Sequence, residues 1–274
     1  MSGSIVVSII IPTHNRAQYL ADAIASVTDQ TYPHIELIVV DDASDPPVEL
    51  PSDIKAKLLR NARNMGPGAS RNMGLAHASG EFLLFLDDDD LLTPGRIALA
   101  VEEMGSARGH VAAVETFTQD GRTQSGFRKF QGDLRSTYLI IHPAIGQVVH
   151  RREDVLQFDP TLRVSQDKEW WIRMSDRAIF EWSDDIGLRI RRHDSERSGV
   201  DSGLRYRTRL EIYRRYKAIL SRPARSNIKR NIASAAFIAG FRFRAAMWSM
   251  QSLVDQPNVR ALQLLAKSLA LRPR

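Results

Sequence analysis

The stretch that decides the fold is residues 81–92, EFLLFLDDDDLL, in which five apolar residues run directly into four aspartates. A short apolar run that follows Gly80 and is closed by Thr93-Pro94 is typical of a β-strand buried on both faces. Asp87 to Asp90, here called the acidic cluster, therefore follow the end of that strand. Four adjacent like charges repel one another, and a hard divalent cation is the expected means of offsetting them. The alternative is a solvated acidic turn.

The position of the acidic cluster favours a ligand site over a plain turn. In open α/β sheets, ligands bind at the carboxyl ends of the strands, where these aspartates are expected to lie. Because hard divalent cations prefer oxygen ligands, a cation there would readily contact phosphate oxygens. The residues alone thus predict a metal–phosphate site.

Strand-like and helix-like segments alternate around this stretch. Strands are expected at 5–11, 35–40, 57–59, 82–86 and 111–114, and helices at 17–30, 69–77 and 94–104. Such alternation predicts an α/β fold with a mostly parallel central sheet and helices on both faces.

Composition restricts the class of protein further. The chain has 274 residues, of which 43% are hydrophobic and 26% charged, enough for one large domain or a domain with an extension. The absence of cysteine excludes disulfides, thiolate chemistry and cysteine-ligated zinc. The N-terminus lacks a basic n-region, and the longest nearly apolar stretch, 232–241, is too short to span a membrane. We therefore expect a cytoplasmic protein.

Charge is distributed unevenly along the chain. Residues 205–274 carry 16 Lys/Arg against two acidic residues, whereas residues 1–204 carry 22 against 30. Helices are expected at 205–221, 228–250 and 259–271. Their apolar faces are suited to packing as helical hairpins, and their basic faces to peripheral contact with an anionic membrane or a lipid phosphate. Nucleic-acid binding through this tail is the weaker alternative.

Four segments taken together resemble one known family. In chain order they are IIIPTHNR (9–16), LIVVDDAS (37–44), NMGPGASRNMGLAHASGEFLLFLDDDD (64–90) and SQDKEWWIRM (165–174). In this order they resemble the family 2 glycosyltransferases of the GT-A fold, over roughly residues 5–200. The resemblance implies a GT-A catalytic domain at 1–204, followed by a basic α-helical extension at 205–274. It also implies inverting transfer of a sugar from a nucleotide diphosphate with the help of a divalent metal.

The resemblance assigns several residues to the donor nucleotide. It implies that Pro12 and Thr13 line the nucleotide pocket, that Asp42 hydrogen-bonds the base, and that Arg71 contacts base or phosphate. The alternatives are that Asp42 forms an Asx turn and that Arg71 is a surface helix residue. By resemblance, Asp42 favours a uridine or thymidine donor.

The acidic cluster matches the Asp-x-Asp motif of the family. Asp89 is implied to ligate Mg²⁺ or Mn²⁺ directly, and Asp87, with the middle residue Asp88, to bind the donor nucleotide. Mg²⁺ takes only one or two protein carboxylates, so the remaining aspartates must serve otherwise. His193 is implied to approach the metal; the alternative is a surface histidine in a basic loop.

The fourth segment carries the acceptor side. Asp167 falls on the position of the family's catalytic base, which takes the proton of the attacking acceptor hydroxyl. The glutamate that usually precedes it is replaced by Gln166. Asp167 could instead be a helix N-cap, and Glu169 is a second candidate for the base. Trp170 and Trp171 are expected on the acceptor side, although at least one could belong to the core.

The resulting hypothesis is a glycosyltransferase of cell-envelope polysaccharide biosynthesis. It would move a hexose from a UDP- or dTDP-sugar to a hydroxyl of a glycan or lipid-linked acceptor, with peripheral membrane contact. A sugar nucleotidyltransferase would show a glycine-rich loop with arginine after the first strand, and Pro12 to Asn15 do not match that pattern. A non-catalytic nucleotide-sugar-binding or scaffold subunit stays open because of Gln166.

Overall fold

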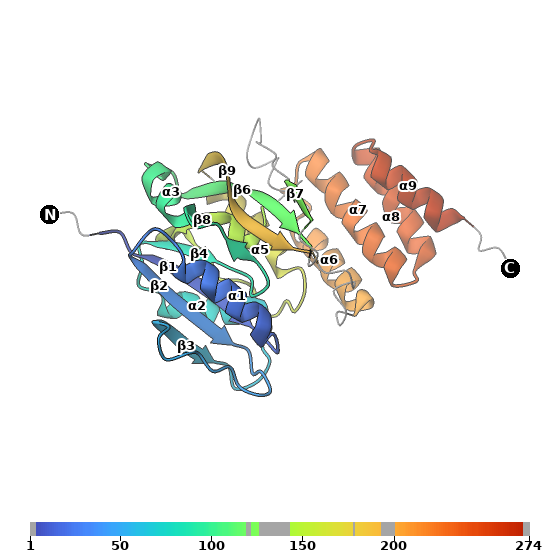
Figure 1. Ribbon diagram of the computed structural model, residues 1–274. Helices are drawn as coiled ribbons and strands as arrows, with labels where there is room; N and C mark the ends of the chain where they lie inside the picture. Colours follow the sequence, from blue (N-terminus) through green and yellow to red (C-terminus); the bar gives the residue numbers. More distant parts are fainter. Residues whose placement is uncertain (1–3, 119–121, 126–142, 178, 193–200, 271–274) are drawn as a thin grey trace. The chain divides into compact units, whose positions relative to one another are not determined.

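The computed structural model describes residues 4–118, 122–125, 143–177, 179–192 and 201–270. Its strands are β1 (Val7–Thr13), β2 (Ile35–Asp41), β3 (Ala56–Arg60), β4 (Phe82–Phe85), β5 (Leu91–Leu92), β6 (Gly109–Phe117), β7 (Thr123–Ser125), β8 (Val148–Arg151) and β9 (Phe180–Arg191). Its α-helices are α1 (Ala17–Thr28), α2 (Pro67–His77), α3 (Arg96–Glu103), α5 (Gln166–Met174), α6 (Ser202–Tyr216), α7 (Arg222–Ile238), α8 (Arg242–Asp255) and α9 (Val259–Leu269). Figure 1 shows these elements coloured along the chain.

The chain divides into two compact units. The first comprises residues 1–131, 143–163 and 176–196, and the second comprises 132–142, 164–175 and 197–274. All the strands belong to the first unit, whereas α5 groups with α6 to α9 in the second. The division into a catalytic domain at 1–204 and an extension at 205–274 stays a prediction.

The first unit is built on a mixed sheet with the strand order β3-β2-β1-β4-β8-β6-β9-β5, and β7 pairs with β6. The run β3-β2-β1-β4 is parallel throughout. β8 pairs antiparallel with both β4 and β6, and the β6–β9 pair is parallel again. The predicted α/β class is therefore confirmed, with the parallel part of the sheet at the N-terminal end of the chain (Figure 1).

Helices cover both faces of the parallel strands. Every residue of β1 is buried, and successive side chains of a strand point to opposite faces. Ile9 and Ile11 pack in one core cluster with residues of α1 and α3. Ile10 points the other way, toward α2, where a Cβ built on Gly74 would lie 2.4 Å from the Ile10 Cγ2 atom. Glycine at position 74 thus allows α2 to approach the sheet closely.

The parallel pairing also decides where the polar residues gather. Thr13 at the end of β1 is in register with Asp41 at the end of β2, and Ile10 with Phe85 of β4. The carboxyl ends of these three strands therefore meet at the same edge of the sheet, and the acidic cluster begins there. This is the edge that the sequence predicts for a ligand site.

Within residues 201–270, the part of the C-terminal region that the structure describes, there are four helices where three were predicted. The helix expected at 228–250 is interrupted between α7 and α8 by Gly240, whose φ is 82°. Phe241 N–H donates to the Ala236 carbonyl at 2.8 Å, and Gly240 N–H to that of Phe237 at 3.0 Å. This pair of hydrogen bonds is a Schellman motif, which ends a helix at a residue that can adopt left-handed backbone angles.

Within the part of the chain that the structure describes, no helix is both long and apolar enough to cross a membrane.

Candidate active site

The acidic cluster forms a tight turn at the end of β4. The Asp90 amide donates to the Asp87 carbonyl at 3.1 Å, which closes the turn. Carboxylate oxygens of Asp87, Asp89 and Asp90 all lie within 4.8 Å of one another. Asp89 and Asp90 are both buried. The tight turn thus brings three carboxylates that are close in sequence into one group with their oxygens near one another.

Two arginines from other segments offset this charge. Arg16, which precedes α1, places Nη1 3.2 Å from Asp88 Oδ1 and 3.0 Å from Asp89 Oδ2. Arg71 of α2 donates from Nη2 to Asp87 Oδ1 at 2.5 Å. Each of these cations is in direct contact with a carboxylate and so reduces the repulsion within the acidic cluster.

Arg71 has hydrogen-bonding capacity to spare. It is only 5% exposed, so the interpretation as a surface helix arginine is wrong. Its guanidinium lies 5.3 Å from the centroid of the Phe158 ring. Among the described residues, Nε and Nη1 of Arg71 find no hydrogen-bond partner although both are buried. Buried unpaired donors are costly, and a bound anion or base would satisfy them.

Asp88 is not part of the group of three converging carboxylates. Thr13 Oγ1 donates to Asp88 Oδ2 at 2.8 Å, and Arg16 holds the second oxygen. Burial raises the pKa of Asp88 to about 6, while the hydrogen bond from Thr13 and the charge of Arg16 act in the opposite direction. Asp88 therefore ties the end of β1 to the acidic turn. Its predicted contact with the donor stays a prediction.

Asp42 organises the segment that leads into α2. Its carboxylate accepts from Asn61 Nδ2 at 2.7 Å, from Met65 N–H at 2.8 Å and from Gly66 N–H at 2.7 Å. The Asx-type contact with a nearby backbone amide belongs instead to its neighbour Asp41, whose Oδ1 accepts from Ser44 N–H at 2.8 Å. Asp42 is buried, and its predicted contact with the base stays a prediction.

The three converging carboxylates suit a hard divalent cation. Two oxygens on opposite sides of such an ion lie roughly 4 to 5 Å apart, twice the metal–oxygen bond. The separation of at most 4.8 Å among Asp87, Asp89 and Asp90 fits that geometry. Asp90 Oδ1 also accepts from Arg191 N–H at 3.1 Å, which ties the acidic turn to β9. The predicted ligand Asp89 belongs to this set. The other predicted ligand, His193, lies outside the described residues.

The predicted base lies in the second unit. Asp167 occupies the first turn of α5, and the N-cap residue is Ser165. The alternative that Asp167 itself caps the helix is therefore wrong. Its predicted role as base stays a prediction.

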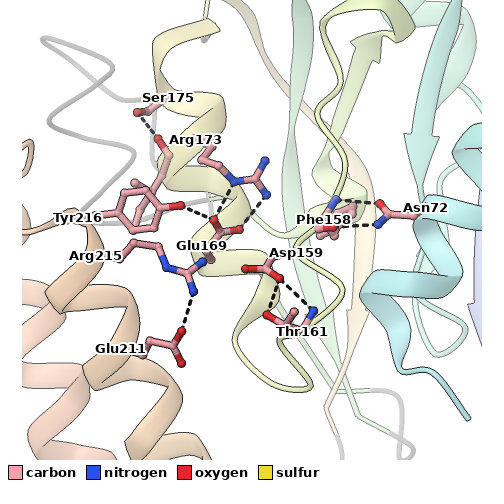
Figure 2. Close-up of polar contacts among 11 residues, drawn as sticks. Asn72, Phe158, Asp159, Thr161, Glu169, Arg173, Ser175, Glu211, Arg215 and Tyr216 are labelled. Atoms are coloured by element: carbon pink, nitrogen blue, oxygen red, sulfur yellow. Dashed lines mark hydrogen bonds and ion pairs between the residues drawn. The ribbon is translucent and has the colours of Figure 1, made fainter.

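Glu169, the second candidate for the base, is fully engaged in structure. It is 1% exposed. Arg173 donates from Nε to Oε1 at 2.7 Å and from Nη2 to Oε2 at 2.8 Å, and the Tyr216 hydroxyl of α6 donates to Oε1 at 2.5 Å (Figure 2). Such a bidentate pair fixes the carboxylate in place. These contacts give Glu169 a structural role in joining α5 to α6.

Trp170 and Trp171 are both buried. Their exposed fractions are 0% and 1%, and the two rings meet edge to face with centroids 4.8 Å apart. A platform on which a sugar stacks needs an accessible ring face. The burial therefore gives no support to an acceptor-side role, which stays a prediction.

Two further residues, Arg16 and Arg191, contact the acidic cluster. The sequence predicts no role for Arg16 and only general assistance with phosphate for Arg191. Arg16 stands in the segment IIIPTHNR, but its contacts lie more than 70 residues further along the chain. Arg191 of β9 donates from Nε to the Asp89 carbonyl at 3.2 Å and from Nη2 to Asp22 at 2.8 Å. Its place in the basic segment just before His193 was the available signal.

Comparison with known proteins gives the family. The family model described as "Glycosyl transferase family 2" matches residues 8–157, more than half of the chain. The segment includes the end of β4, the acidic cluster, Arg16 and Arg71.

Two relatives with named activities match over shorter segments. A "GalNAc(5)-diNAcBac-PP-undecaprenol beta-1,3-glucosyltransferase" of Campylobacter jejuni is 35% identical over 128 residues, 44% of this chain and 41% of that protein. A "UDP-Glc:alpha-D-GlcNAc-diphosphoundecaprenol beta-1,3-glucosyltransferase" of Escherichia coli is 37% identical over 103 residues, 36% of this chain and 41% of that protein. The matched segments thus span about two fifths of these relatives' lengths.

Solved structures show the same fold. The crystal structure of S. aureus TarS 1–349 in complex with UDP-GlcNAc superposes with a TM-score of 0.59 at 15% identity, covering 96% of this chain and 91% of that one. At this identity the likeness concerns the fold alone, and it confirms the predicted GT-A-like arrangement. From the matched segment, which carries the acidic turn and its arginines, the chain belongs to glycosyl transferase family 2.

Proposed function

We propose that this protein is an inverting, metal-dependent glycosyltransferase that uses a UDP- or dTDP-sugar and a lipid-linked glycan acceptor. The observation that carries the proposal is the convergence of Asp87, Asp89 and Asp90 at the carboxyl end of β4, beside the unsatisfied donors of Arg71. Carboxylates for a cation and free guanidinium donors together form a site for a nucleoside diphosphate.

On the donor side, the chain's residues bind and orient the nucleotide. Asp89, together with at most one of its neighbours Asp87 and Asp90, would hold Mg²⁺ or Mn²⁺. The bound cation supplies Lewis-acid stabilisation of the charge that develops on the departing nucleoside diphosphate. The free Nε and Nη1 of Arg71 would contact the base or a phosphate oxygen. Thr13 and Arg16 keep Asp88 turned toward β1, which fixes the shape of the acidic turn.

On the acceptor side, Asp167 would take the proton of the attacking hydroxyl as its oxygen bonds to the anomeric carbon. Inversion requires one such base, because attack and departure of the leaving group take place on opposite faces of the sugar. The contacts of Glu169 support this assignment, since a carboxylate held by Arg173 and Tyr216 is not available to a substrate.

The class of acceptor is inferred from relatives. Both named relatives act on sugars linked through a diphosphate to undecaprenol. An acceptor of this kind is membrane-bound, which agrees with the basic charge of residues 205–274. We therefore extend the proposal to a place in cell-envelope glycan assembly, with the protein in peripheral contact with the membrane.

A thermal-shift panel of nucleotide sugars, with and without Mn²⁺, tests the donor. A ligand that binds the folded state alone raises the melting temperature by mass action, so the correct donor should stand out. Mn²⁺ should enlarge the shift in the wild type but not in Asp89→Asn. No shift with any nucleotide would contradict the proposal.

The alternative is a non-catalytic nucleotide-sugar-binding subunit. It is kept because Gln166 replaces the glutamate expected beside the base. Such a protein would show a donor-dependent shift yet never release nucleoside diphosphate in the presence of acceptor lipids.

A further inference from the structure

Four basic side chains gather in the second unit, on three different helices. Lys168 lies on α5, Arg205 and Arg209 lie one turn apart on α6, and Arg230 lies on α7. We call them the cationic cluster. Arg209 Nη1 donates to the Asn231 carbonyl at 2.8 Å, which brings α6 against α7 beside Arg230. All four side chains are partly buried rather than extended into solvent.

The pKa values of three members of the cationic cluster are lowered. Burial lowers the pKa of Lys168, Asp167 opposes that effect, and Arg209 and Arg230 add to it. Burial also lowers the pKa of Arg209, and Arg205 lowers it further. Arg230 shows the same direction, with burial as the main cause. Cations held this close destabilise one another, and among the described residues Asp167 is the carboxylate that opposes this effect on Lys168 and Arg209.

The three arginines have few partners. Within the described parts of the chain, Arg205, Arg209 and Arg230 form no ion pair with an acidic residue. Arg209 uses one nitrogen for the Asn231 carbonyl, and its buried Nε has no hydrogen-bond partner among the described residues. Arg230 contacts Asn227 on its own helix. Donors that are partly desolvated and unpaired are favourable places for an anion.

We propose that the cationic cluster binds the diphosphate group of the acceptor, so that it forms a phosphate subsite next to Asp167. This inference rests on the proposed function for the identity of the acceptor. Guanidinium groups match phosphate oxygens through two parallel hydrogen bonds, and several of them suit a group with more than one negative charge.

The position of the subsite restricts the acceptor further. Lys168 adjoins Asp167 in the sequence, and Asp167 acts electrostatically on both Lys168 and Arg209. A diphosphate held by these cations would lie close to the group that takes the hydroxyl proton. The hydroxyl and the diphosphate would then belong to the same sugar or to adjacent sugars. We therefore expect short diphosphate-linked acceptors to be preferred over long ones.

The first experiment measures binding of inorganic pyrophosphate by calorimetry in EDTA, so that no divalent cation bridges it to the acidic cluster. The wild type should bind saturably, and the double variant Arg209→Gln/Arg230→Gln should bind at least about tenfold more weakly, as expected for lost charged hydrogen bonds. The milder Arg205→Gln, whose side chain makes no hydrogen bond within the described residues, should also weaken binding even if the double variant folds poorly. Asp167→Asn should bind as tightly as the wild type or more tightly, because a repelling charge is removed.

Two control variants give the assay its specificity. Arg214 is exposed on the same helix α6, so Arg214→Gln should bind pyrophosphate like the wild type. Arg71→Gln reports on the donor side. If Arg71→Gln loses binding while the cluster variants keep it, or if Arg214→Gln loses as much as they do, the proposal is overturned.

The second experiment uses a short-chain GlcNAc-diphospholipid as acceptor and the matching phosphate-free glycoside. The cluster variants should raise the KM for the diphospholipid at least about tenfold, with the KM for the donor unchanged, and should leave transfer to the glycoside unaffected. An equal effect on both acceptors would overturn the proposal. So would cluster variants that lose binding to phosphatidylglycerol vesicles but not to pyrophosphate, because the cluster would then recognise bulk lipid. If the protein binds pyrophosphate through the cationic cluster but transfers no sugar, the proposed function is contradicted while the anion-binding role of the cluster still holds.

Discussion

The four aspartates of the acidic cluster are identical residues in a row, but their environments in the structure differ. Asp88 is held by Thr13 and Arg16, whereas Asp87, Asp89 and Asp90 converge. Because adjacent residues of a tight turn point in different directions, one carboxylate can fasten the turn while the others offer oxygens to a cation. Substitutions at adjacent positions should therefore have different consequences.

Asp89→Asn should remove the response to metal, because a neutral amide is a weak ligand for a hard cation. Loss of this electrostatic stabilisation should lower kcat by about 10²- to 10³-fold and abolish the Mn²⁺ dependence of donor binding. Asp88→Asn should retain that dependence, since Asp88 faces Thr13 and Arg16. Titration of Mn²⁺ against donor affinity measures both, and equal loss in the two variants would contradict the assignment.

Asp167→Asn and Glu169→Gln should separate chemistry from structure. Asp167→Asn removes the proposed base and should lower kcat by about 10²- to 10⁴-fold. It should change the free energy of unfolding little. The second removes one partner of a buried ion pair with Arg173 and should lower the free energy of unfolding by about 3 kcal/mol. Rate assays and urea unfolding on both variants provide the check. An active Asp167→Asn with a stable but inactive Glu169→Gln would mean that the base is Glu169.

His150 on β8 should make stability depend on pH. Burial, with the charge of Arg96 adding to it, lowers the pKa of His150 from 6.5 to about 3. Below pH 6.5 the unfolded chain therefore binds a proton that the folded protein refuses, so stability falls as the pH drops toward about 3. The loss should reach about 2 kcal/mol between pH 7 and pH 5. The free energy of unfolding, measured with urea at several pH values in this range, should change less with pH in His150→Leu than in the wild type. An equal pH dependence in the two proteins would contradict the assignment.

At the scale of elements, the break between α7 and α8 illustrates how a single residue ends a helix. A Cβ built on Gly240 would meet nothing within 4 Å, so space is not the reason for glycine there. The φ of 82° is the reason, because a side chain in that conformation crowds its own backbone.

Gly240→Ala should therefore destabilise the protein through its backbone alone, by about 1 kcal/mol. Gly240→Asn should cost less, because asparagine tolerates left-handed angles better than alanine does. Thermal unfolding of the two variants beside the wild type tests this order. If alanine proves as stable as glycine, the two helices can run on as one.

At the scale of the whole molecule, charge and exposed apolar side chains occur together in the C-terminal helices. Phe243 is 84% exposed and Val259 70%, among a large excess of basic residues. Amphipathic cationic helices of this composition bind anionic membrane surfaces.

Vesicles containing about 20% phosphatidylglycerol should therefore bind the protein at low salt, and binding should weaken steeply as NaCl rises from about 0.05 to 0.5 M. Phe243→Ser should weaken sedimentation with vesicles. Ile179→Ser, which removes an exposed apolar side chain of the first unit, should have no effect. If the wild type does not bind at low salt, the basic helices serve another purpose.

Much of the fold and part of the site could be predicted from the sequence, because these features depend on local patterns. The apolar run before Asp87 predicts β4 and places the acidic turn at its end, and β1 and β2 follow from similar runs. Four short segments in order were enough to indicate the family. Helix ends followed less well: Gly240 breaks a helix predicted as continuous, since the choice between a tolerated glycine and a Schellman motif depends on what the next residues can pack against.

Only the tertiary structure decided which side chains meet. Arg16 reaches Asp88 and Asp89 across more than 70 residues because parallel pairing brings the ends of β1 and β4 together. The burial of Trp170 and the hydrogen bond from Tyr216 to Glu169 depend on the packing of α5 within the second unit. A linear sequence specifies which charges and rings are present, but their partners are chosen by contacts between segments far apart in the chain. Those contacts form only when the whole core is buried.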